Sequence, residues 1–580
     1  MTGLKFTPSR LRSWSTLRDK TQTVHITGWA DTGDKLVSGV PLAQHILDGL
    51  ETPLPFSEII RGLNGNFAVV VDSPAAIHTG VDAVRSIPLF YSNEEDTTVV
   101  SDDARSLHED GRTIDDRSAV EYAAAGFVTG PHTLFHEVSG IQAGECVSWH
   151  RGDTTPRTER YYRYACTYDS DLSVELLCEQ FDEVMTAVFR RLVDSLDGRQ
   201  IIVPLSGGLD SRLIATTLKR LGYDNVLCLF YGLPGHPESV MSRDVAKALG
   251  YQWLHVPYIG RDWRETLDSP GMHEYWSFTS NGVSPPNCDD WPALKELRDN
   301  HGVSDDAVFV PGHTGDFISG GHLHSIFDPA SHEDPHDFAG GMVRKHYSLW
   351  EDLVATDGIR EAIGHRLEEV LGIFPRETNE DLARMYEYWE WQERQAKLII
   401  NSVRSYEFFG YSWRIPLWDM DVMEFWRRVP LDLKMDKCLY RRYLASNDPA
   451  ALFQDTVPVA RWNRNKAYEL RNRGARGRLR ALLNRTGPTA AVFGRFNKLR
   501  RHLRQYRHHP LGMARASSGL RYLLREPSKR NSFSLLVRDF LYAEYSLEIS
   551  ALLSRIKTGG LDIGPEQTDR ADIDSSGGTA

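Results

Sequence analysis

The chain has 580 residues, a net charge of −12 at neutral pH and 41% apolar residues, so it can bury more than one hydrophobic core. No apolar run reaches about 18 residues, and the first residues lack the pattern of a signal peptide. We therefore expect neither a membrane-spanning nor a secreted protein, but a cytoplasmic one. The six cysteines form no CxxC pair, which argues against a zinc site and a disulfide framework.

Residues 1–160 are typical of a β-rich domain, because short β-branched and aromatic runs alternate with turn residues. The expected strands are 23–27, 67–71, 88–92, 97–101 and 145–149. The polar stretch 150–160 that follows is expected to be a linker to the next domain.

A buried strand that runs directly into a glycine turn and a helix is the strongest local signal. Residues 201–205 (Ile-Ile-Val-Pro-Leu) have the β-branched content of a parallel strand, and a helical pattern begins at Ser211. The unpaired N–H groups and the dipole of such a helix start favour an anion. Ser206 and Ser211 add hydroxyl donors, and Asp210 can hold a magnesium ion against phosphates. The Gly-Lys-Ser/Thr ending of a Walker A loop is absent.

Strand and helix signals alternate through a second domain, 173–460, and predict a parallel sheet with helices on both faces. We expect helices at 173–195 and 238–249, and strands within 225–235, 252–258 and 307–316. Ligands bind at the carboxyl ends of parallel strands, so the loops that follow these strands should converge. From about residue 330 the pattern is mostly helical and rich in tryptophan.

A basic helical extension is predicted at 461–555, followed by a disordered tail at 556–580. Within it, residues 461–507 carry 15 Lys or Arg and a single acidic residue, and 534–553 is typical of one amphipathic helix. A basic run with interleaved aromatic residues could bind RNA through phosphates and stacking. Arg-rich helical segments are more often solvated surfaces, so nucleic acid is not the expected partner.

Three strings in the second domain carry a family resemblance. Ser-Gly-Gly-Leu-Asp-Ser at 206–211 resembles the pyrophosphate loop of enzymes that cleave ATP between its α and β phosphates. Pro-Gly-His-Thr-Gly-Asp-Phe-Ile-Ser-Gly-Gly at 311–321 stands where class B asparagine synthetases have Ser-Gly-Glu-Gly-Ala-Asp-Glu-x-Phe-Gly-Gly. The same enzymes have Arg-x-Pro-Phe-Leu-Asp where this sequence has Arg-Ile-Pro-Leu-Trp-Asp at 414–419. They have Glu-Lys-x-x-x-Arg where this sequence has Asp-Lys-x-x-x-Arg at 436–441.

The chain is similar to this family, which includes β-lactam synthetases and lasso-peptide cyclases, well over 175–445 and weakly over 60–110. The resemblance implies an α/β protein. Its first part would be an α+β Ntn-hydrolase-like glutaminase domain. The second would be a parallel-sheet, adenine-nucleotide α-hydrolase-like ATP pyrophosphatase domain with a helical C-terminal part.

The resemblance also implies a set of site residues. Asp210 and Asp316 match the magnesium-side carboxylates, and Lys437 matches the lysine that neutralises the α-phosphate. Lys437, Asp316 and His313 are therefore the candidate catalytic residues, although Lys437 could also be an ordinary surface lysine. The residues expected to bind ATP and pyrophosphate are Leu205, Ser206, Gly207, Gly208, Asp210, Ser211, Tyr231, Pro311 and Gly312.

The residues expected to face the attacking amine, called the acceptor side below, depart from the family. His313 replaces the glutamate that takes a proton from the attacking amine, and histidine is competent for that role. The alternative is a loop histidine that packs or contacts phosphate. Phe317 replaces the second glutamate and Pro311 the leading serine, so the ATP side matches better than the acceptor side.

The first domain follows the order of the family's glutaminase domain at 63–72, Asp82, 87–91 and 101–105. Thr2 stands in place of the nucleophilic cysteine, and the substrate segment Asn-Gly-Glu-Ile-Tyr-Asn is absent. Thr2 activated by its own amine is an alternative nucleophile. We expect a degenerate domain kept for structure or docking, whose glutaminase activity is in doubt.

The implied activity is that of an AMP-forming amide ligase that uses ATP and Mg²⁺. It joins a small carboxylate, by default aspartate, to ammonia or another amine. Alternatives are amidation or cyclisation of a surface-polysaccharide sugar acid or a peptide, adenylation of a tRNA base, and a non-catalytic relative. A homodimer is one assembly that fits, and no membrane partner is expected.

Overall fold

The computed structural model describes residues 3–9, 12–33, 35–94, 97–107, 113–151, 153, 155–258, 263–300, 302–323, 338–448, 451–453 and 531–558, with isolated positions at 499, 500, 503, 511 and 513. Thr2, the basic stretch 461–507 apart from three residues, and the tail beyond 558 therefore lie outside the described residues. Within them, no helix is both long and apolar enough to cross a membrane.

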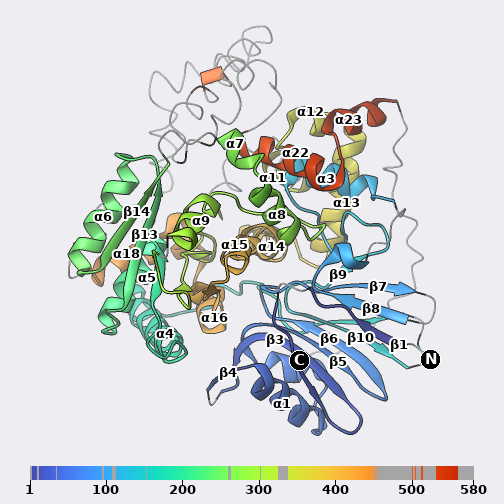
Figure 1. The fold of residues 1–580 in the computed structure, drawn as a ribbon, viewed down its shortest axis with the longest axis horizontal. Helices are drawn as coiled ribbons and strands as arrows, with labels where there is room; N and C mark the ends of the chain where they lie inside the picture. The colour runs from blue at the N-terminus through green and yellow to red at the C-terminus, as the bar shows by residue number, and fades with distance from the viewer. Residues whose placement is uncertain are drawn as a thin grey trace.

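Two β-sheets build the first domain (Figure 1). The larger has the strand order β11-β10-β6-β5-β3-β2 with β4 beside β3, and the smaller has the order β1-β8-β7-β9. In chain order the strands are β1 (Gly3–Phe6), β2 (Ser15–Arg18), β3 (Thr23–Asp31), β4 (Leu36–Ser38), β5 (Asn64–Asp72), β6 (Ala76–Val81), β7 (Phe90–Glu94), β8 (Thr97–Ser101), β9 (Ser139–Gly140), β10 (Glu145–His150) and β11 (Arg157–Arg160). Each of the five strands expected from the sequence has a counterpart, but the one expected at 88–92 begins two residues later, at Phe90, and ends at Glu94.

The alternation of side chains along β5 explains the layers of this domain. Phe67 and Val69 pack with the helices α1 (Gly39–Leu50) and α2 (Phe56–Arg61), which cover one face of the larger sheet. Ala68 belongs to the core shared with the smaller sheet on the other face. Because strand side chains alternate between faces, a single strand serves both interfaces.

The linker expected at 150–160 is wrong in its second half. Strand β11 pairs antiparallel with β10, with Glu145 opposite Arg160, and so forms an edge of the larger sheet. An edge strand with an exposed, charged face has the composition of a linker, and pairing with β10 is not visible in its own residues.

The second domain is organised around a five-stranded parallel sheet in the order β14-β13-β12-β15-β16. Its strands are β12 (Ile201–Pro204), β13 (Val226–Gly232), β14 (Gln252–Pro257), β15 (Val308–Phe309) and β16 (Ser412–Trp413). The first strand in the chain, β12, lies in the middle, and the strand order reverses between β12 and β15. This switch point is where an open parallel sheet binds its ligand.

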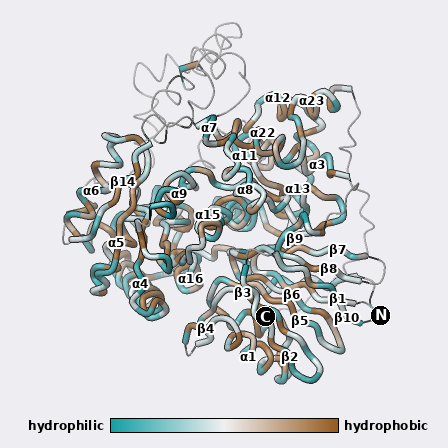
Figure 2. The backbone as a smooth tube through the Cα atoms, in the orientation of Figure 1, coloured by the Kyte–Doolittle hydropathy of each residue, from teal (hydrophilic) through white to brown (hydrophobic). Residues whose placement is uncertain are grey.

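Helices lie on both faces of this sheet, as predicted (Figure 1). Helix α6 (Pro237–Leu249) lies on one side of β13 and β14, and α9 (Trp291–Asp299) on the other. Figure 2 shows hydrophobic residues recurring along the strands, whereas the outer helix α6 is largely hydrophilic. The α/β fold class with a parallel sheet is therefore confirmed.

The remaining helices give this domain its helical C-terminal part. Ser173 caps α4 by accepting from Leu176 N, as the predicted start at 173 requires. Helix α3 (Asp116–Ala125) belongs to the first domain. The helices of the second domain and of the segment after it are α4 (Val174–Asp194), α5 (Leu209–Arg220), α7 (Trp263–Leu267), α8 (Pro270–Thr279), α10 (Gly315–Ile318), α11 (Phe338–His346), α12 (Glu351–Val354), α13 (Asp357–Leu371), α14 (Asn379–Trp389), the π-helix η3 (Glu390–Ile399), the 3-10 helix η4 (Ile400–Val403), α15 (Arg404–Phe408), α16 (Met420–Arg428), α17 (Leu431–Lys434), α18 (Cys438–Ser446), α22 (Ser532–Tyr545) and α23 (Ile549–Lys557).

The single helix expected at 534–553 is wrong. Two helices, α22 and α23, occupy the region, because Ser546 takes a left-handed backbone conformation with φ 55° and ends α22. The apolar pattern continues across this corner, so the sequence does not reveal the break. Helix α22 packs on α3 of the first domain and on α8 of the second (Figure 1).

Candidate active site

The loop between β12 and α5 is held by hydrogen bonds among its own residues. Gly208 N donates to Ser206 Oγ at 3.0 Å, and Ser206 N donates to Ser211 Oγ at 3.2 Å. No side chain caps the N-terminus of α5. The N–H groups of its first turn therefore point out of the carboxyl edge of the sheet, where a phosphate would be stabilised.

A buried arginine that sequence reasoning missed binds the backbone carbonyls of this loop. Arg212 is 1% exposed, and its guanidinium donates to Gly207 O at 3.0 Å, to Gly208 O at 3.2 Å and to Leu452 O at 2.7 Å. It directly follows Ser211 in the sequence. Carbonyl groups that would repel a phosphate are thereby turned away from the site and satisfied.

The loop after β15 lies directly on the phosphate loop. Asp316 N donates to Asp210 Oδ2 at 3.0 Å. A Cβ at Gly312 would lie 2.9 Å from Ser211 N, and one at Gly315 would overlap the Asp210 carboxylate, so only glycine allows this approach. Burial raises the pKa of Asp210 above its usual range, and the nearby Lys437 ammonium opposes this shift.

Lys437 reaches the same point from the N-terminus of α18. Its ammonium forms an ion pair with Asp316, and its side chain packs over Gly321. Asp436 and Lys437 both have a left-handed backbone conformation, with φ 55° and 59°. Residues other than glycine adopt this conformation only at a cost in free energy. Burial lowers the pKa of Lys437, and the Asp210 carboxylate opposes that shift.

Tyr440 is a second residue that sequence reasoning missed. It follows Lys437 by about one helical turn, and its hydroxyl donates to Asp210 Oδ1 at 2.9 Å. Because Lys437 precedes α18 with a left-handed backbone, no helical spacing in the sequence relates the two side chains. The structure thus brings Asp210, Asp316 and Lys437 together, with Tyr440 as their support.

Asp210 and Asp316 offer oxygen ligands suited to Mg²⁺. The described residues contain no group of three or more His, Cys, Asp or Glu side chains arranged to hold a metal. Mg²⁺ is commonly bound by one or two carboxylates together with substrate phosphates and water, so this pair fits the ion.

The other predicted nucleotide residues lie at the same edge of the sheet. Leu205 is buried and its N–H donates to Leu229 O at 2.8 Å, while Pro311 follows the adjacent strand. The Tyr231 ring, at the end of β13, stacks on Tyr258 with the ring centroids 5.9 Å apart. No hydrogen bond among the described residues joins Tyr231 to the phosphate loop, so its place beside that loop comes from the strand order alone.

The acceptor side is formed by η3 and η4 facing the loop after β15. His313 Nε2 lies 3.1 Å from Ser402 Oγ, and Thr314 Oγ1 donates to Gln395 Oε1 at 3.4 Å. Burial lowers the pKa of His313 to about 4. Phe317 is 1% exposed and packs against Tyr164 and Trp418, so this position is part of the core.

A buried carboxylate near the phosphate loop binds a histidine and an arginine. Glu390 is fully buried and accepts from His322 Nδ1 at 2.6 Å and from Arg394 at 2.8 Å. These partners lower the pKa of Glu390 despite its burial. Because Glu390 lies 68 residues after His322, no local pattern in the sequence could relate them.

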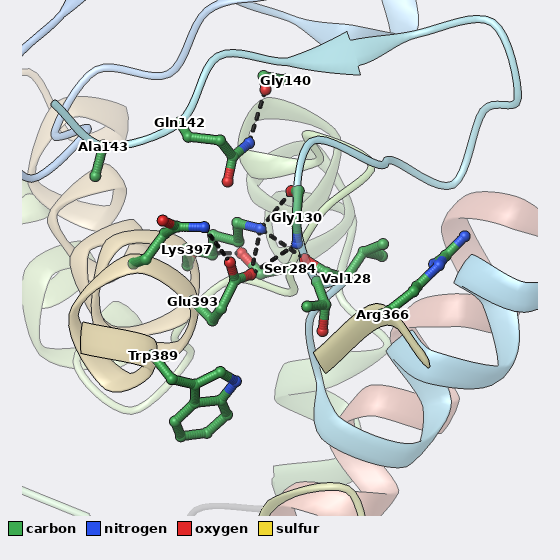
Figure 3. A network of polar contacts seen from close by, with 12 residues as sticks. Val128, Gly130, Gly140, Gln142, Ala143, Ser284, Arg366, Trp389, Glu393 and Lys397 are labelled. Atoms are coloured by element: carbon green, nitrogen blue, oxygen red, sulfur yellow. Dashed lines mark hydrogen bonds and ion pairs between the residues drawn. The ribbon is translucent and has the colours of Figure 1, made fainter. Parts of the chain in front are cut away.

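The same π-helix is anchored to the first domain (Figure 3). Lys397 Nζ lies 2.5 Å from Glu393 Oε2 and donates to the carbonyls of Val128 and Gly130 at 2.9 and 2.6 Å. Gly130 N donates to the same Glu393 oxygen at 3.0 Å. Nearby, Trp391 Nε1 donates to Ala83 O at 2.9 Å. The acceptor side therefore rests on the interface between the two domains.

These features define a class of protein: a parallel-sheet synthetase fold with a glycine loop at its switch point, behind a two-sheet N-terminal domain. The Asparagine synthase family matches residues 182–520, and the Glutamine amidotransferase domain matches residues 56–162. The first match covers more than half of the chain, so the protein belongs to the asparagine synthase family. The second match lies within the first domain.

Two curated proteins are similar to parts of the chain. The Microcin J25-processing protein McjC of Escherichia coli is 24% identical over 54% of this chain and 58% of its own length. A probable asparagine synthetase [glutamine-hydrolyzing] of Acanthamoeba polyphaga mimivirus is 23% identical over 48% of this chain and 49% of its own length. The chain thus spans about half the length of the curated relatives it matches.

Solved structures also match parts of the chain, and two of them are described here. One is described as the allosteric regulatory enzyme of purine biosynthesis, with 12% identity over 52% of this chain and 56% of the other and a TM-score of 0.17. The second is glutamine phosphoribosylpyrophosphate amidotransferase from B. subtilis, with 9% identity over 52% and 64% and a TM-score of 0.16. Similarity this low carries no argument about the site.

Proposed function

We propose that the protein is an ATP-dependent, AMP-forming amide ligase that adenylates a carboxylate and transfers the acyl group to an amine. The observation that carries the proposal is the meeting of Asp210, Asp316 and Lys437 on a glycine loop at the switch point of the parallel sheet. Two carboxylates and one lysine beside uncapped N–H groups suit a magnesium–phosphate substrate. Membership of the asparagine synthase family supports the same reaction class.

In the first half-reaction a carboxylate oxygen attacks the α-phosphorus of ATP, the bond to the bridging oxygen breaks and pyrophosphate leaves. The N–H groups of α5 and the hydroxyls of Ser206 and Ser211 would hold the pyrophosphate. Lys437 would balance the negative charge that gathers on the α-phosphoryl group. Asp210 and Asp316 would bind Mg²⁺, which offsets phosphate charge when it is present.

In the second half-reaction an amine attacks the acyl carbon and AMP leaves with the electron pair of the acyl–oxygen bond. A base must take the proton that the amine loses. His313 is the candidate, because burial lowers its pKa to about 4 and the ring is therefore neutral at physiological pH.

Free ammonia or another amine is proposed as the nitrogen source in place of glutamine. The family's Asn-Gly-Glu-Ile-Tyr-Asn segment is absent from the sequence. The contacts of η3 with Gly130 and Ala83 support a structural role for the first domain instead.

The test is pyrophosphate and AMP release from Mg-ATP across a panel of carboxylates, each with ammonia or with glutamine. We expect release with aspartate and ammonia, no release with glutamine in place of ammonia, and loss of release in Asp210→Asn. The control Asp224→Asn changes an exposed aspartate and should keep full activity. Unchanged turnover in Asp210→Asn, or no release with any acid, would overturn the proposal.

A second candidate is cyclisation or amidation of a peptide or another larger carboxylate. The relative named as a Microcin J25-processing protein favours it, as does an acceptor side that departs from the family at His313 and Phe317. This candidate would be selected if no small acid supports pyrophosphate release but peptides that carry a carboxylate and a free amine do. Release with RNA alone would instead favour a tRNA-modifying enzyme. The cytoplasmic location and the homodimer stay predictions.

A further inference from the structure

The two ring nitrogens of His313 have different surroundings. Nε2 lies 3.1 Å from Ser402 Oγ, on the 3-10 helix η4. Nδ1 is buried and has no hydrogen-bond partner among the described residues. A buried polar nitrogen without a hydrogen-bond partner is unfavourable, so its position calls for a partner that the described residues do not supply.

The direction of the hydrogen bond made by the Ser402 hydroxyl determines which ring nitrogen of His313 carries the hydrogen. Ser402 Oγ also lies 2.6 Å from Ile399 O, and a carbonyl oxygen can only accept. The single hydroxyl hydrogen of Ser402 is therefore donated to Ile399. Only a lone pair remains to face His313, so Nε2 must carry the ring hydrogen and Nδ1 must carry the lone pair.

The position of His313 in the loop relates this lone pair to the reaction. The residue before it, Gly312, lies against Ser211 N, and Gly315 lies against the Asp210 carboxylate. His313 thus belongs to the four-residue segment that contacts the phosphate loop at both ends. Burial lowers its pKa to about 4, which leaves the ring neutral and the lone pair available at physiological pH.

We propose that Ser402 is a positioning residue that fixes His313 as its Nε2–H tautomer, so that Nδ1 accepts the proton of the attacking amine. This inference rests on the proposed function. As the amine nitrogen bonds to the acyl carbon, one of its N–H bonds breaks and the proton moves to the lone pair of Nδ1. AMP departs with the electron pair of the acyl–oxygen bond, and Nδ1–H later returns its proton to solvent.

The first test needs no substrate. In protein labelled with [¹⁵N]histidine, correlation spectra report the tautomer of each neutral ring, and the signal missing in His313→Asn identifies His313. We expect the Nε2–H tautomer in the wild type and in Ser402→Thr, and a mixture of both tautomers in Ser402→Ala. An Nδ1–H tautomer in the wild type, or an unchanged ring in Ser402→Ala, would overturn the proposal.

The second test separates the half-reactions. Ser402→Ala should lower amine-dependent amide formation about 10- to 100-fold and leave carboxylate-dependent ATP–pyrophosphate exchange within about twofold, with Ser402→Thr restoring the rate. The control Ser446→Ala removes another serine hydroxyl that donates to a carbonyl three residues earlier, on α18, and should change neither rate.

Equal loss of both half-reactions in Ser402→Ala would mean that Ser402 only supports the fold, which would overturn the proposal. A wild type without exchange activity contradicts the proposed function and the base role of His313 together. The spectra still decide the tautomer in that case, so the two failures can be told apart.

Discussion

The two loops that meet at the site, 205–211 after β12 and 311–322 after β15, are supported in different ways. Hydrogen bonds among residues 206–211 hold the phosphate loop in shape, and Arg212 binds one of its backbone carbonyls. On the acceptor side, His313 and Thr314 contact the segment 390–402, which in turn is anchored to the first domain. The nucleotide side is thus a local structure of the second domain, whereas the acceptor side depends on the domain interface.

This difference suggests how substrates could change while the reaction is kept. Gly312 and Gly315, where the second loop meets the phosphate loop, leave no room for a side chain. The acceptor side is built from segments that are distant in the sequence and are held by contacts with the first domain. Substitutions in the two regions should therefore affect different half-reactions.

The largest effect is expected from Lys437→Met. Loss of the only lysine beside Asp316 among the described residues removes the charge that balances the α-phosphate, so both half-reactions should fall about 10³-fold. ATP–pyrophosphate exchange and amide formation measure the two steps. Lys247→Met, on the exposed face of α6, is the control and should keep both rates. A Lys437→Met enzyme within about threefold of the wild type would contradict the assignment.

The second largest effect is expected from breaking the buried ion pair of Glu393 and Lys397 at the domain interface. Lys397→Met leaves Glu393 as a buried charge without its cation, so the free energy of unfolding should fall by about 3–5 kcal/mol in urea denaturation. The double variant Lys397→Met/Glu393→Gln should recover part of this loss. Lys295→Met breaks an exposed pair with the same i, i+4 spacing and should change stability by less than about 0.5 kcal/mol. Equal losses in the two single variants would refute the anchoring role.

Gly315→Ala tests the close contact of the two loops. The new Cβ would overlap the Asp210 carboxylate, so we expect exchange activity to fall about 10- to 100-fold. Gly364→Ala, in α13, meets no atom within 4 Å and should keep its activity and gain up to about 1 kcal/mol of stability. Full exchange activity in Gly315→Ala would show that Asp210 can move without loss.

The smallest effect is expected from Asp436→Gly. Asp436 has φ 55°, a conformation that glycine adopts without strain, so unfolding should become less favourable by about 1 kcal/mol. Asp432→Gly, within the short helix α17, should have the opposite sign, because glycine is a poor helix former. Urea titration compares the two, and destabilisation by both would show that the backbone of Asp436 carries little strain.

How much the sequence could reveal follows from the same comparison. The strand, glycine turn and helix around Ser206 are a continuous local pattern, so the phosphate loop and its sheet could be predicted. The link between His322 and Glu390 could not, because these residues are far apart in the chain and their pairing depends on packing. The spacing of Glu393 and Lys397 was visible, but their contact with Gly130 depends on how the two domains meet.

The most direct measurement of the central claim follows oxygen from the substrate. The protein is incubated with Mg-ATP, ammonia and aspartate whose carboxylates carry ¹⁸O, or with whichever acid supports pyrophosphate release. We predict one ¹⁸O atom in AMP and none in pyrophosphate, because the carboxylate oxygen bonds to the α-phosphorus and stays there when the amide forms. Label in inorganic phosphate with ADP as the nucleotide product, or AMP without label, would contradict adenylation.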